Sequence, residues 1–138
     1  MGLKLEHVSY LYGTDTELLV RALDDVNLEI PDGQFIGLIG HTGSGKSTLV
    51  QHLNGLLKPS EGTILFNGEN IWAQDYSRKT LRSKVGLVFQ YPEHQLFETD
   101  VFADVCYGPK NLGLEQGEIE RRAKKALELV GFPEKFFG

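Results

Sequence analysis

The sequence has very little of what secreted or membrane-spanning proteins depend on. Its 138 residues contain a single cysteine, Cys106, which excludes an internal disulfide framework and a zinc site built on cysteines. No apolar run approaches the roughly 18 residues needed to cross a bilayer. Residues 1–6 alternate like a strand and lack the apolar core of a signal peptide. We therefore expect a protein of the cytoplasm, or of the cytoplasmic face of a membrane.

Positive charge is also in short supply. The chain has 14 Lys and Arg against 19 Asp and Glu, a net charge of -5, which argues against a nucleic-acid groove. One cluster of four cations, Arg78, Lys79, Arg82 and Lys84, is more typical of a solvated face than of a phosphate or partner contact. Glycine, by contrast, is abundant at 16 residues, which indicates tight turns or backbone that approaches a ligand closely.

Hydrophobic periodicity predicts a mixed α/β chain whose first section is an antiparallel β layer. Half-buried strands are expected at 3–8, 26–30 and 63–66, with turns at 31–33 and at Asn67-Gly68. Two further segments, Phe35–Ile39 and Val85–Phe89, are apolar on both faces, as strands of a parallel core sheet are. Helices are expected at three places: Ser47–Asn54, Thr99 to about Tyr107 before Gly108-Pro109 breaks it, and a last helix with the stripe Ile119, Ala123, Ala126, Leu127 and Val130.

One motif carries recognisable chemistry. The run Gly40-His41-Thr42-Gly43-Ser44-Gly45-Lys46-Ser47 matches G-x-x-x-x-G-K-[ST] at every required position, after an expected strand and before an expected helix. The glycines let backbone N–H groups turn inward as a nest for phosphate oxygens, and the helix N-terminus adds its positive dipole end. Lys46 supplies a mobile charge for the β- and γ-phosphates, and the Ser47 hydroxyl ligates Mg²⁺. The motif predicts a nucleoside triphosphate site rather than a glycine-rich turn with an incidental lysine.

Other candidate residues are weaker when taken alone. Gln90 ends the expected strand Val85–Phe89, where α/β sheets present groups to ligands, yet a solvated strand end is the commoner case. Tyr10 and Tyr12 are able to stack on a base, although core packing is commoner for such residues. The histidines share no metal-ligand spacing, so we expect no histidine metal site; they are His7, His41, His52 and His94.

Several stretches together resemble one known family. They are VSYLY at 8–12, ALDDVNL at 22–28, GHTGSGKST at 40–48, QHLNGL at 51–56, VFQYPEHQLFE at 88–98 and YGPKNLGL at 107–114. The chain resembles the ATPase subunits of energy-coupling factor transporters, ABC-type machines that import vitamins and transition-metal ions. Of the two ATPase subunit types it is more similar to the second. The segments FQYPEHQLFE and YGPKNLGL are the specific part, since the loop alone indicates only the superfamily.

The resemblance implies a fold and a set of roles. The fold would be a P-loop NTPase of ABC ATPase type, with an N-terminal antiparallel β layer and a partial parallel core sheet, in one nucleotide-binding domain over 1–138. Tyr12 would be the aromatic residue that stacks on adenine, and Gln90 the glutamine that reaches Mg²⁺ or the attacking water. Lys46 and Gln90 would be catalytic, and Ser47 and Gln90 would hold Mg²⁺. ATP would contact Tyr12, Gly40, His41, Thr42, Gly43, Ser44, Gly45, Lys46, Ser47 and Thr48.

It also implies partners and a place in the cell. A second ATPase subunit, forming a heterodimer, would sandwich Mg-ATP and drive a transmembrane T component, which works with a substrate-binding S component. The subunit would be peripheral on the cytoplasmic side of the cell membrane, and residues 91–98 would lie near the membrane subunit.

Three parts of the family pattern do not occur in the sequence. They are an LSGGQ-like signature, a Walker B strand that ends in Asp-Glu, and a switch histidine. The interpretation is a domain incomplete at its C-terminus, which ends before the signature and binds ATP without turnover, while ATPase activity belongs to the longer protein. A soluble P-loop kinase and a non-catalytic nucleotide-binding module remain as alternatives.

Overall fold

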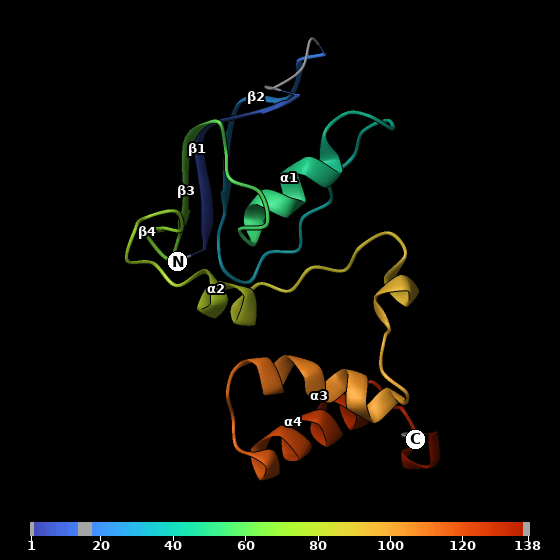
Figure 1. Ribbon diagram of the computed structural model, residues 1–138. Helices are drawn as coiled ribbons and strands as arrows, with labels where there is room; N and C mark the ends of the chain where they lie inside the picture. The colour runs from blue at the N-terminus through green and yellow to red at the C-terminus, as the bar shows by residue number, and fades with distance from the viewer. Residues whose placement is uncertain (1, 14–17, 137–138) are drawn as a thin grey trace. The chain divides into compact units, whose positions relative to one another are not determined.

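The computed structural model describes residues 2–13 and 18–136, which form two compact units divided after Leu87. The first unit contains all the strands and the first two helices, and the second contains the remaining helices (Figure 1). Each unit is described by itself below. That residues 1–138 form one nucleotide-binding domain stays a prediction.

The first unit is built on a four-stranded sheet in the order β2-β1-β3-β4. Every neighbouring pair is antiparallel, so the expected N-terminal antiparallel layer is confirmed. The turn at Asn67-Gly68 joins the last two strands and has positive φ at both residues, as a type I′ hairpin turn requires. The strands are β1 (Leu3–Tyr12), β2 (Val20–Ile30), β3 (Glu61–Phe66) and β4 (Glu69–Asn70).

An irregularity in β1 determines which of its side chains face the core. Leu5 and Val8 are both buried although they are three residues apart, a spacing that places residues of a regular strand on opposite faces. The pairing of β1 with β2 shifts between these two residues, and His7 between them has φ 53°. The bulge thus returns Val8 to the buried face.

Helices α1 (Lys46–Leu53) and α2 (Arg78–Lys84) accompany the sheet in the first unit, and Figure 1 shows α1 beside it. Leu49 and Leu53 of α1 pack against a buried cluster, and α1 ends in a Schellman motif at Gly55. Its bonds run from the N–H of Gly55 to the His52 carbonyl at 3.3 Å and from Leu56 to Gln51 at 3.0 Å. The buried cluster is Leu5, Val8, Leu23, Ile64, Ile71 and Leu81.

Two of the four clustered cations on α2 make specific contacts. The Arg82 guanidinium donates to the Gly55 carbonyl at 2.8 Å and so ties α2 to the end of α1. Arg78 lies over the Trp72 ring, with its guanidinium carbon 4.5 Å from the ring centroid, a cation–π arrangement. The expected solvated face is therefore correct for Lys79 and Lys84, whose side chains are exposed, but incomplete for the two arginines.

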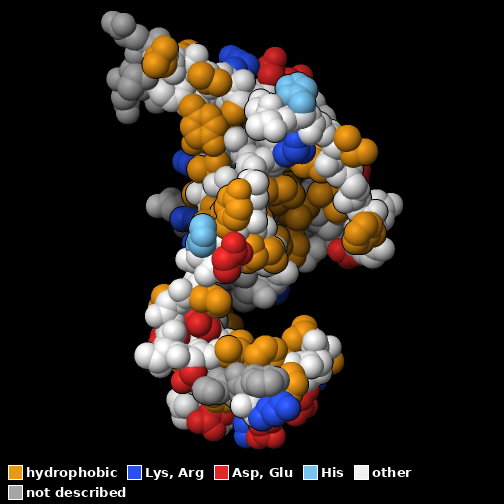
Figure 2. Space-filling model, turned by 90° about the vertical axis from the view of Figure 1, so that its right-hand side faces the viewer, with side chains coloured by type: hydrophobic (Ala, Val, Ile, Leu, Met, Phe, Trp, Pro, Cys, Tyr) orange, Lys and Arg blue, Asp and Glu red, His pale blue; other side chains and the backbone are white. Residues whose placement is uncertain are grey.

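The predicted partial parallel core sheet is not formed within residues 2–13 and 18–136. Neither Phe35–Ile39 nor Val85–Phe89 is a strand, and Phe35, Ile39 and Val88 are 103%, 96% and 81% exposed. A strand that is apolar on both faces is stable inside a sheet whose two faces are covered, and the described sheet includes neither segment. Figure 2 accordingly shows hydrophobic side chains at the surface of each unit.

The second unit is a helical hairpin preceded by a 3₁₀ turn. Helices α3 (Val101–Asn111) and α4 (Gln116–Leu129) pack side by side (Figure 1). The turn η1 (Pro92–Gln95) precedes them and a second turn, η2 (Glu134–Phe136), follows. No helix in the described part of the chain is long and apolar enough to span a bilayer.

The predicted bounds of α3 were wrong at both ends. Asp100, not Thr99, is the N-cap, and its carboxylate accepts from the Ala103 N–H at 2.7 Å. Gly108-Pro109 does not end the helix, which continues to Asn111. A proline near the C-terminus of a helix removes one backbone hydrogen bond, and here only two helical residues follow it.

The apolar stripe of α4 is confirmed in part. Ile119, Ala123 and Leu127 are buried, whereas Ala126 and Val130 are exposed. On the exposed side of α4, Glu118 pairs with Arg121 at 2.6 Å and with Arg122 at 2.8 Å. The two guanidinium hydrogen bonds hold the pKa of the Glu118 carboxyl at about 2. The Glu120 carboxylate accepts from the Gln116 side chain at 3.0 Å.

The unpaired apolar segments lead to a testable prediction. Backbone N–H groups of residues 35–39 and 86–89 belong to no helix or strand, so they should exchange with deuterium at least ~100-fold faster than those of β1 and β3. Hydrogen exchange followed by mass spectrometry on the 138-residue chain would measure this. Protection of 35–39 equal to that of β1 would mean that this segment is paired in solution.

Candidate functional site

The glycine-rich loop 40–46 closes on itself and opens directly into α1. The Ser44 N–H donates to the His41 carbonyl at 3.2 Å, and the Leu49 N–H donates to the Gly45 carbonyl at 2.9 Å as the first helical turn forms. The N-cap, Gly45, carries no side chain that caps the helix, and no acidic residue lies in the first turn. The first N–H groups of α1 are therefore left for another acceptor, as at helix N-termini that bind anions.

The Lys46 ammonium lies on the inside of this loop. It donates to the backbone carbonyls of Gly40 and His41, the second at 2.8 Å, and its distance to the Ser44 hydroxyl oxygen is 3.3 Å. All three partners are neutral oxygens of the loop. Because a charged acceptor forms roughly twice as strong a hydrogen bond with an ammonium, phosphate oxygens would compete well for the Lys46 donors.

Two glycines of the motif lie where a side chain would meet close neighbours. A Cβ on Gly40 would lie 2.6 Å from the Ser44 hydroxyl oxygen and 3.6 Å from the Lys46 nitrogen, inside the curl of the loop. Gly45 has φ +95°, and a Cβ there would lie 2.7 Å from the Ala22 carbonyl oxygen of β2. The absence of a side chain at Gly40 keeps the inside of the loop open, and its absence at Gly45 lets the loop pass close to the sheet.

The hydroxyl residues that follow Lys46 face different surroundings. Ser47 is exposed on the first turn of α1, and Thr48 is only 7% exposed. The Thr48 hydroxyl oxygen is 3.0 Å from the hydroxyl oxygen of Tyr12, at the end of β1. The structure therefore brings Tyr12 together with residues 40–48, all within the first unit.

The two tyrosines of β1 differ in exposure. Tyr12 is 41% exposed, whereas Tyr10 is partly buried against the core cluster. Their rings meet edge to face, with centroids 4.8 Å apart. Of the two, Tyr12 has the surface that stacking on a base requires, and Tyr10 supports it from the core side. Its stacking role stays a prediction.

His52, one of the histidines without metal-ligand spacing, lies at the back of this site. Its side chain is fully buried, its Nδ1 is 2.7 Å from the Thr48 carbonyl oxygen, and its ring meets the Tyr10 ring edge to face at 4.9 Å. Its Nε2 is buried without a hydrogen-bond partner in the described chain. Burial lowers the pKa of the imidazole, and the Thr48 hydrogen bond partly opposes this.

Gln90 belongs to the second unit. It is exposed and precedes η1, where the rings of Tyr91 and His94 stack with centroids 5.5 Å apart. The expected strand before Gln90 is absent, so the prediction that Gln90 ends a strand is wrong. Further along, the Asp104 carboxylate accepts from the N–H groups of Phe97 and Glu98 at 3.3 Å, which fixes this segment on α3.

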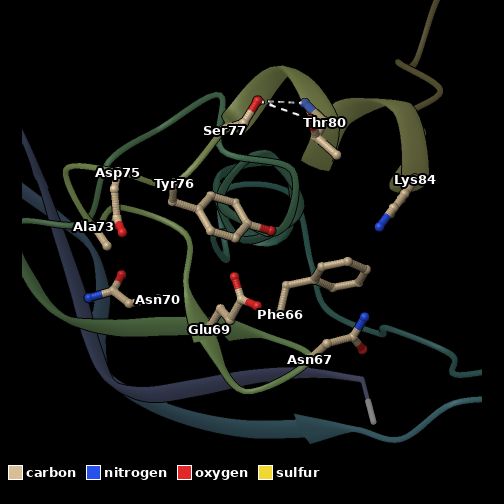
Figure 3. Close-up of a pocket in the computed structure, with 10 residues that line it drawn as sticks. All are labelled: Phe66, Asn67, Glu69, Asn70, Ala73, Asp75, Tyr76, Ser77, Thr80 and Lys84. Atoms are coloured by element: carbon tan, nitrogen blue, oxygen red, sulfur yellow. Dashed lines mark hydrogen bonds between the residues drawn. The ribbon is translucent and has the colours of Figure 1, made fainter.

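A separate pocket of about 540 Å³ lies in the first unit between β3, β4 and α2. Figure 3 shows Glu69, Tyr76 and Lys84 reaching into it, and Ser77 and Thr80 bonded to each other at its rim. Burial and the nearby Glu69 carboxylate raise the pKa of the Tyr76 hydroxyl. None of the residues predicted to bind nucleotide lines this pocket.

Comparison with known proteins places this site in a family. Residues 23–136 match the family described as ABC transporter. The chain belongs to the ABC transporter family. The expected resemblance to energy-coupling factor ATP-binding proteins of the second type is also confirmed. Proteins named energy-coupling factor transporter ATP-binding protein EcfA2 match at 54% identity in Caldanaerobacter subterraneus and 52% in Clostridium tetani, each over 95% of this chain.

Solved ABC-family structures agree with this placement. The cbiO1 structure from Clostridium perfringens, titled as part of the ABC transporter complex cbiONQ, is 42% identical with a TM-score of 0.76 over 98% of this chain. The cassette MJ0796, titled as a dimer bound to ADP and Pi, is 27% identical with a TM-score of 0.77 over 98% of this chain. The chain spans 46% of the length of the first two relatives, 52% of cbiO1 and 60% of MJ0796.

Sequence reasoning missed the link between His52 and the loop. A search for metal spacing treats a histidine as a ligand, whereas His52 acts through a helical i,i+4 contact with Thr48. The available signal was that a helix places residues four apart on one face, so Thr48 and His52 share the side of α1 that meets β1.

The buried imidazole predicts a pH dependence. Because its pKa is lowered on folding, the unfolded chain binds a proton below about pH 6.5 that the folded chain resists. The free energy of unfolding should therefore fall as pH drops from 7.5 to 5, by up to about 1.4 kcal/mol per pH unit from this residue. Urea unfolding of the wild-type chain and of His52→Phe at four pH values measures it. Equal pH slopes in the two proteins would contradict the assignment.

Proposed function

We propose that this chain is the nucleotide-binding part of an ATP-binding subunit of an energy-coupling factor importer, which powers uptake of vitamins or transition-metal ions. The observation that carries the proposal is the Lys46 ammonium held on the inside of a glycine-rich loop, at an uncapped helix N-terminus. A loop of this form, joined to a sequence half identical to EcfA2 proteins, supports ATP as the ligand.

The residues of the loop have distinct proposed roles. Backbone N–H groups of Gly43, Ser44 and Gly45 would surround the β-phosphate, and the Lys46 ammonium would exchange its carbonyl partners for β- and γ-phosphate oxygens. Tyr12 would stack on adenine at the other end of the ligand, and His41, Thr42 and Thr48 would complete the cradle.

The donor set also fits magnesium. The exposed Ser47 hydroxyl lies one residue beyond Lys46, and Mg²⁺ favours hydroxyl and phosphate oxygens over a cage made of protein side chains alone. Ser47 and Gln90 are the proposed protein ligands. When bound, the ion would neutralise charge on the β- and γ-phosphates.

The proposed protein partners are those of a full-length ATP-binding subunit. A second ATPase subunit, a T component and an S component are proposed, with the subunit peripheral on the cytoplasmic side of the cell membrane. In that protein, strands from outside the matched region would pair with Phe35–Ile39 and Val85–Phe89, and hydrolysis would depend on those added residues.

Family membership affects the two alternative functions differently. Membership of the ABC family sets aside the soluble P-loop kinase. The non-catalytic nucleotide-binding module is a matter for experiment, since it predicts ATP binding without turnover even after a partner ATPase subunit is added.

Removal of the Lys46 charge tests the phosphate cradle. Lys46→Ala should weaken Mg-ATP binding by roughly 10- to 100-fold, because hydrogen bonds to charged groups contribute about 1.5–3 kcal/mol. Its midpoint of thermal unfolding should change little, because the hydrogen bonds of the Lys46 ammonium to described residues go to its own loop. Calorimetric titration of the chain and the variant with Mg-ATP measures the first quantity.

Lys79→Ala is the matched control, since it removes one exposed lysine charge from α2 outside the loop. It should bind Mg-ATP as the wild-type chain does. If Lys46→Ala lost affinity and thermal stability to the same degree, the lysine would be structural rather than a phosphate ligand.

Gln90 is tested in the assembled transporter. Gln90→Ala should leave ATP affinity within about threefold of wild type while lowering hydrolysis coupled to transport, because we propose that Gln90, besides reaching Mg²⁺, links the nucleotide to the membrane subunit. Nucleotide titration and vesicle uptake with the full-length subunit in its complex separate the two effects. A large loss of ATP affinity by itself would argue against the coupling role.

A further inference from the structure

We propose that His52 is a positioning residue that fixes the orientation of Tyr12 and so sets how strongly the site prefers a nucleotide to a bare phosphate chain. The inference rests on the proposed function, in which a nucleotide occupies the loop and Tyr12 meets its base. It concerns four residues that form a closed ring of contacts between β1 and α1, named here the Tyr–His ring: Tyr10, Tyr12, Thr48 and His52.

One half of the Tyr–His ring is made of hydrogen bonds. The hydroxyl oxygens of Tyr12 and Thr48 are 3.0 Å apart, and the Thr48 carbonyl oxygen is 2.7 Å from Nδ1 of His52. A carbonyl oxygen only accepts, so the proton must be on Nδ1. The imidazole therefore acts as a donor that restrains Thr48, the residue whose hydroxyl contacts Tyr12.

The other half is made of aromatic contacts. The His52 ring meets Tyr10 at 4.9 Å with an interplanar angle of 75°, and Tyr10 meets Tyr12 at 4.8 Å with an angle of 83°. Both distances and angles are those of edge-to-face pairs. Tyr12 is thus held at its hydroxyl by Thr48 and at its ring by Tyr10, and His52 contacts both of these supports.

The chemistry of His52 argues for more than packing. It is fully buried, and its Nε2 is left without a hydrogen-bond partner in the described chain. An apolar ring of similar size would fill the same space without an unpaired buried nitrogen. His52 therefore has one buried nitrogen without a partner, while its other nitrogen donates to the Thr48 carbonyl. This is expected where a side chain fixes the position of a neighbouring residue.

A restrained Tyr12 affects one end of a nucleotide only. Tyr12 is 41% exposed while two neighbours limit the rotation of its ring, so little side-chain freedom remains to be lost when a base stacks on it. The phosphates would meet residues 40–47, which are not members of the Tyr–His ring. Loss of the restraint should therefore weaken binding of ATP but not of inorganic tripolyphosphate.

The experiment compares these two ligands by calorimetry, with Mg²⁺ present, on the 138-residue chain. His52→Phe keeps a flat ring and removes the Nδ1 donor, while His52→Asn keeps a donor and removes the ring. Each should weaken ATP binding about three- to tenfold and leave tripolyphosphate binding within twofold of wild type. In a variant that still binds tripolyphosphate, equal losses for both ligands, or an unchanged ATP affinity, would overturn the inference.

A double mutant tests whether His52 acts through Tyr12. In a Tyr12→Ala background, His52→Phe should have no further effect on the ratio of ATP to tripolyphosphate affinity, because the residue that it positions is absent. A further drop of the same size would show that His52 acts by another route.

The same titrations serve as controls for folding and for the proposed function. Tripolyphosphate binding reports an intact loop; if a His52 variant lost it, Tyr12→Phe, which removes only the hydroxyl bonded to Thr48, would decide the matter. A weaker preference for ATP in Tyr12→Phe supports the inference, and an unchanged preference overturns it. A wild-type chain that binds neither ligand would instead refute the proposed function, and the inference with it.

Discussion

A β-strand that is apolar on both faces is stable only where both faces are covered, and this constraint decides which of the predicted strands form. The segments Phe35–Ile39 and Val85–Phe89 belong to no strand of the described residues, and Phe35 and Val88 are 103% and 81% exposed, although Val85 packs against the buried cluster. The antiparallel sheet is complete without them, since β1, β2 and β3 pair with one another and cover their own core. The strands that form are therefore those whose pairing partners are among the described residues. The chain spans about half the length of its relatives.

The same distinction explains which sequence predictions succeeded. The Asn67-Gly68 turn and the curl at residues 40–46 depend on residues within a few positions of one another, and both formed as predicted. The helix predicted at Ser47–Asn54 formed within one residue of those bounds, as α1. The two predicted parallel strands, at Phe35–Ile39 and Val85–Phe89, depend on pairing partners that are distant in the sequence. Their apolar pattern is typical of strands buried on both faces, and the described residues do not bury them in this way.

The site shows a similar boundary between local and long-range information. Residues 40–48 were predictable as a unit because the motif specifies backbone shape and charge together. The link from Tyr12 to Thr48 was not, because it joins β1 to α1 across 36 residues of sequence, whereas the contact between Thr48 and His52 spans one helical turn and was missed although its signal was local. The wrong bounds of α3 have a smaller cause: Asp100 competes with Thr99 as a cap, and Pro109 is tolerated because the helix ends soon after it.

Helix α1 connects the two ends of the proposed ligand site. Its first residues close the glycine loop around the Lys46 ammonium, and its next turn carries Thr48 and His52 against the tyrosines of β1. A displacement of α1 would therefore change the phosphate cradle and the base-facing aromatic residue together. The Schellman end at Gly55, and the Arg82 hydrogen bond to the Gly55 carbonyl, hold the far end of the helix to α2. The helix is thus anchored at both ends, so phosphate recognition and base recognition share one rigid element.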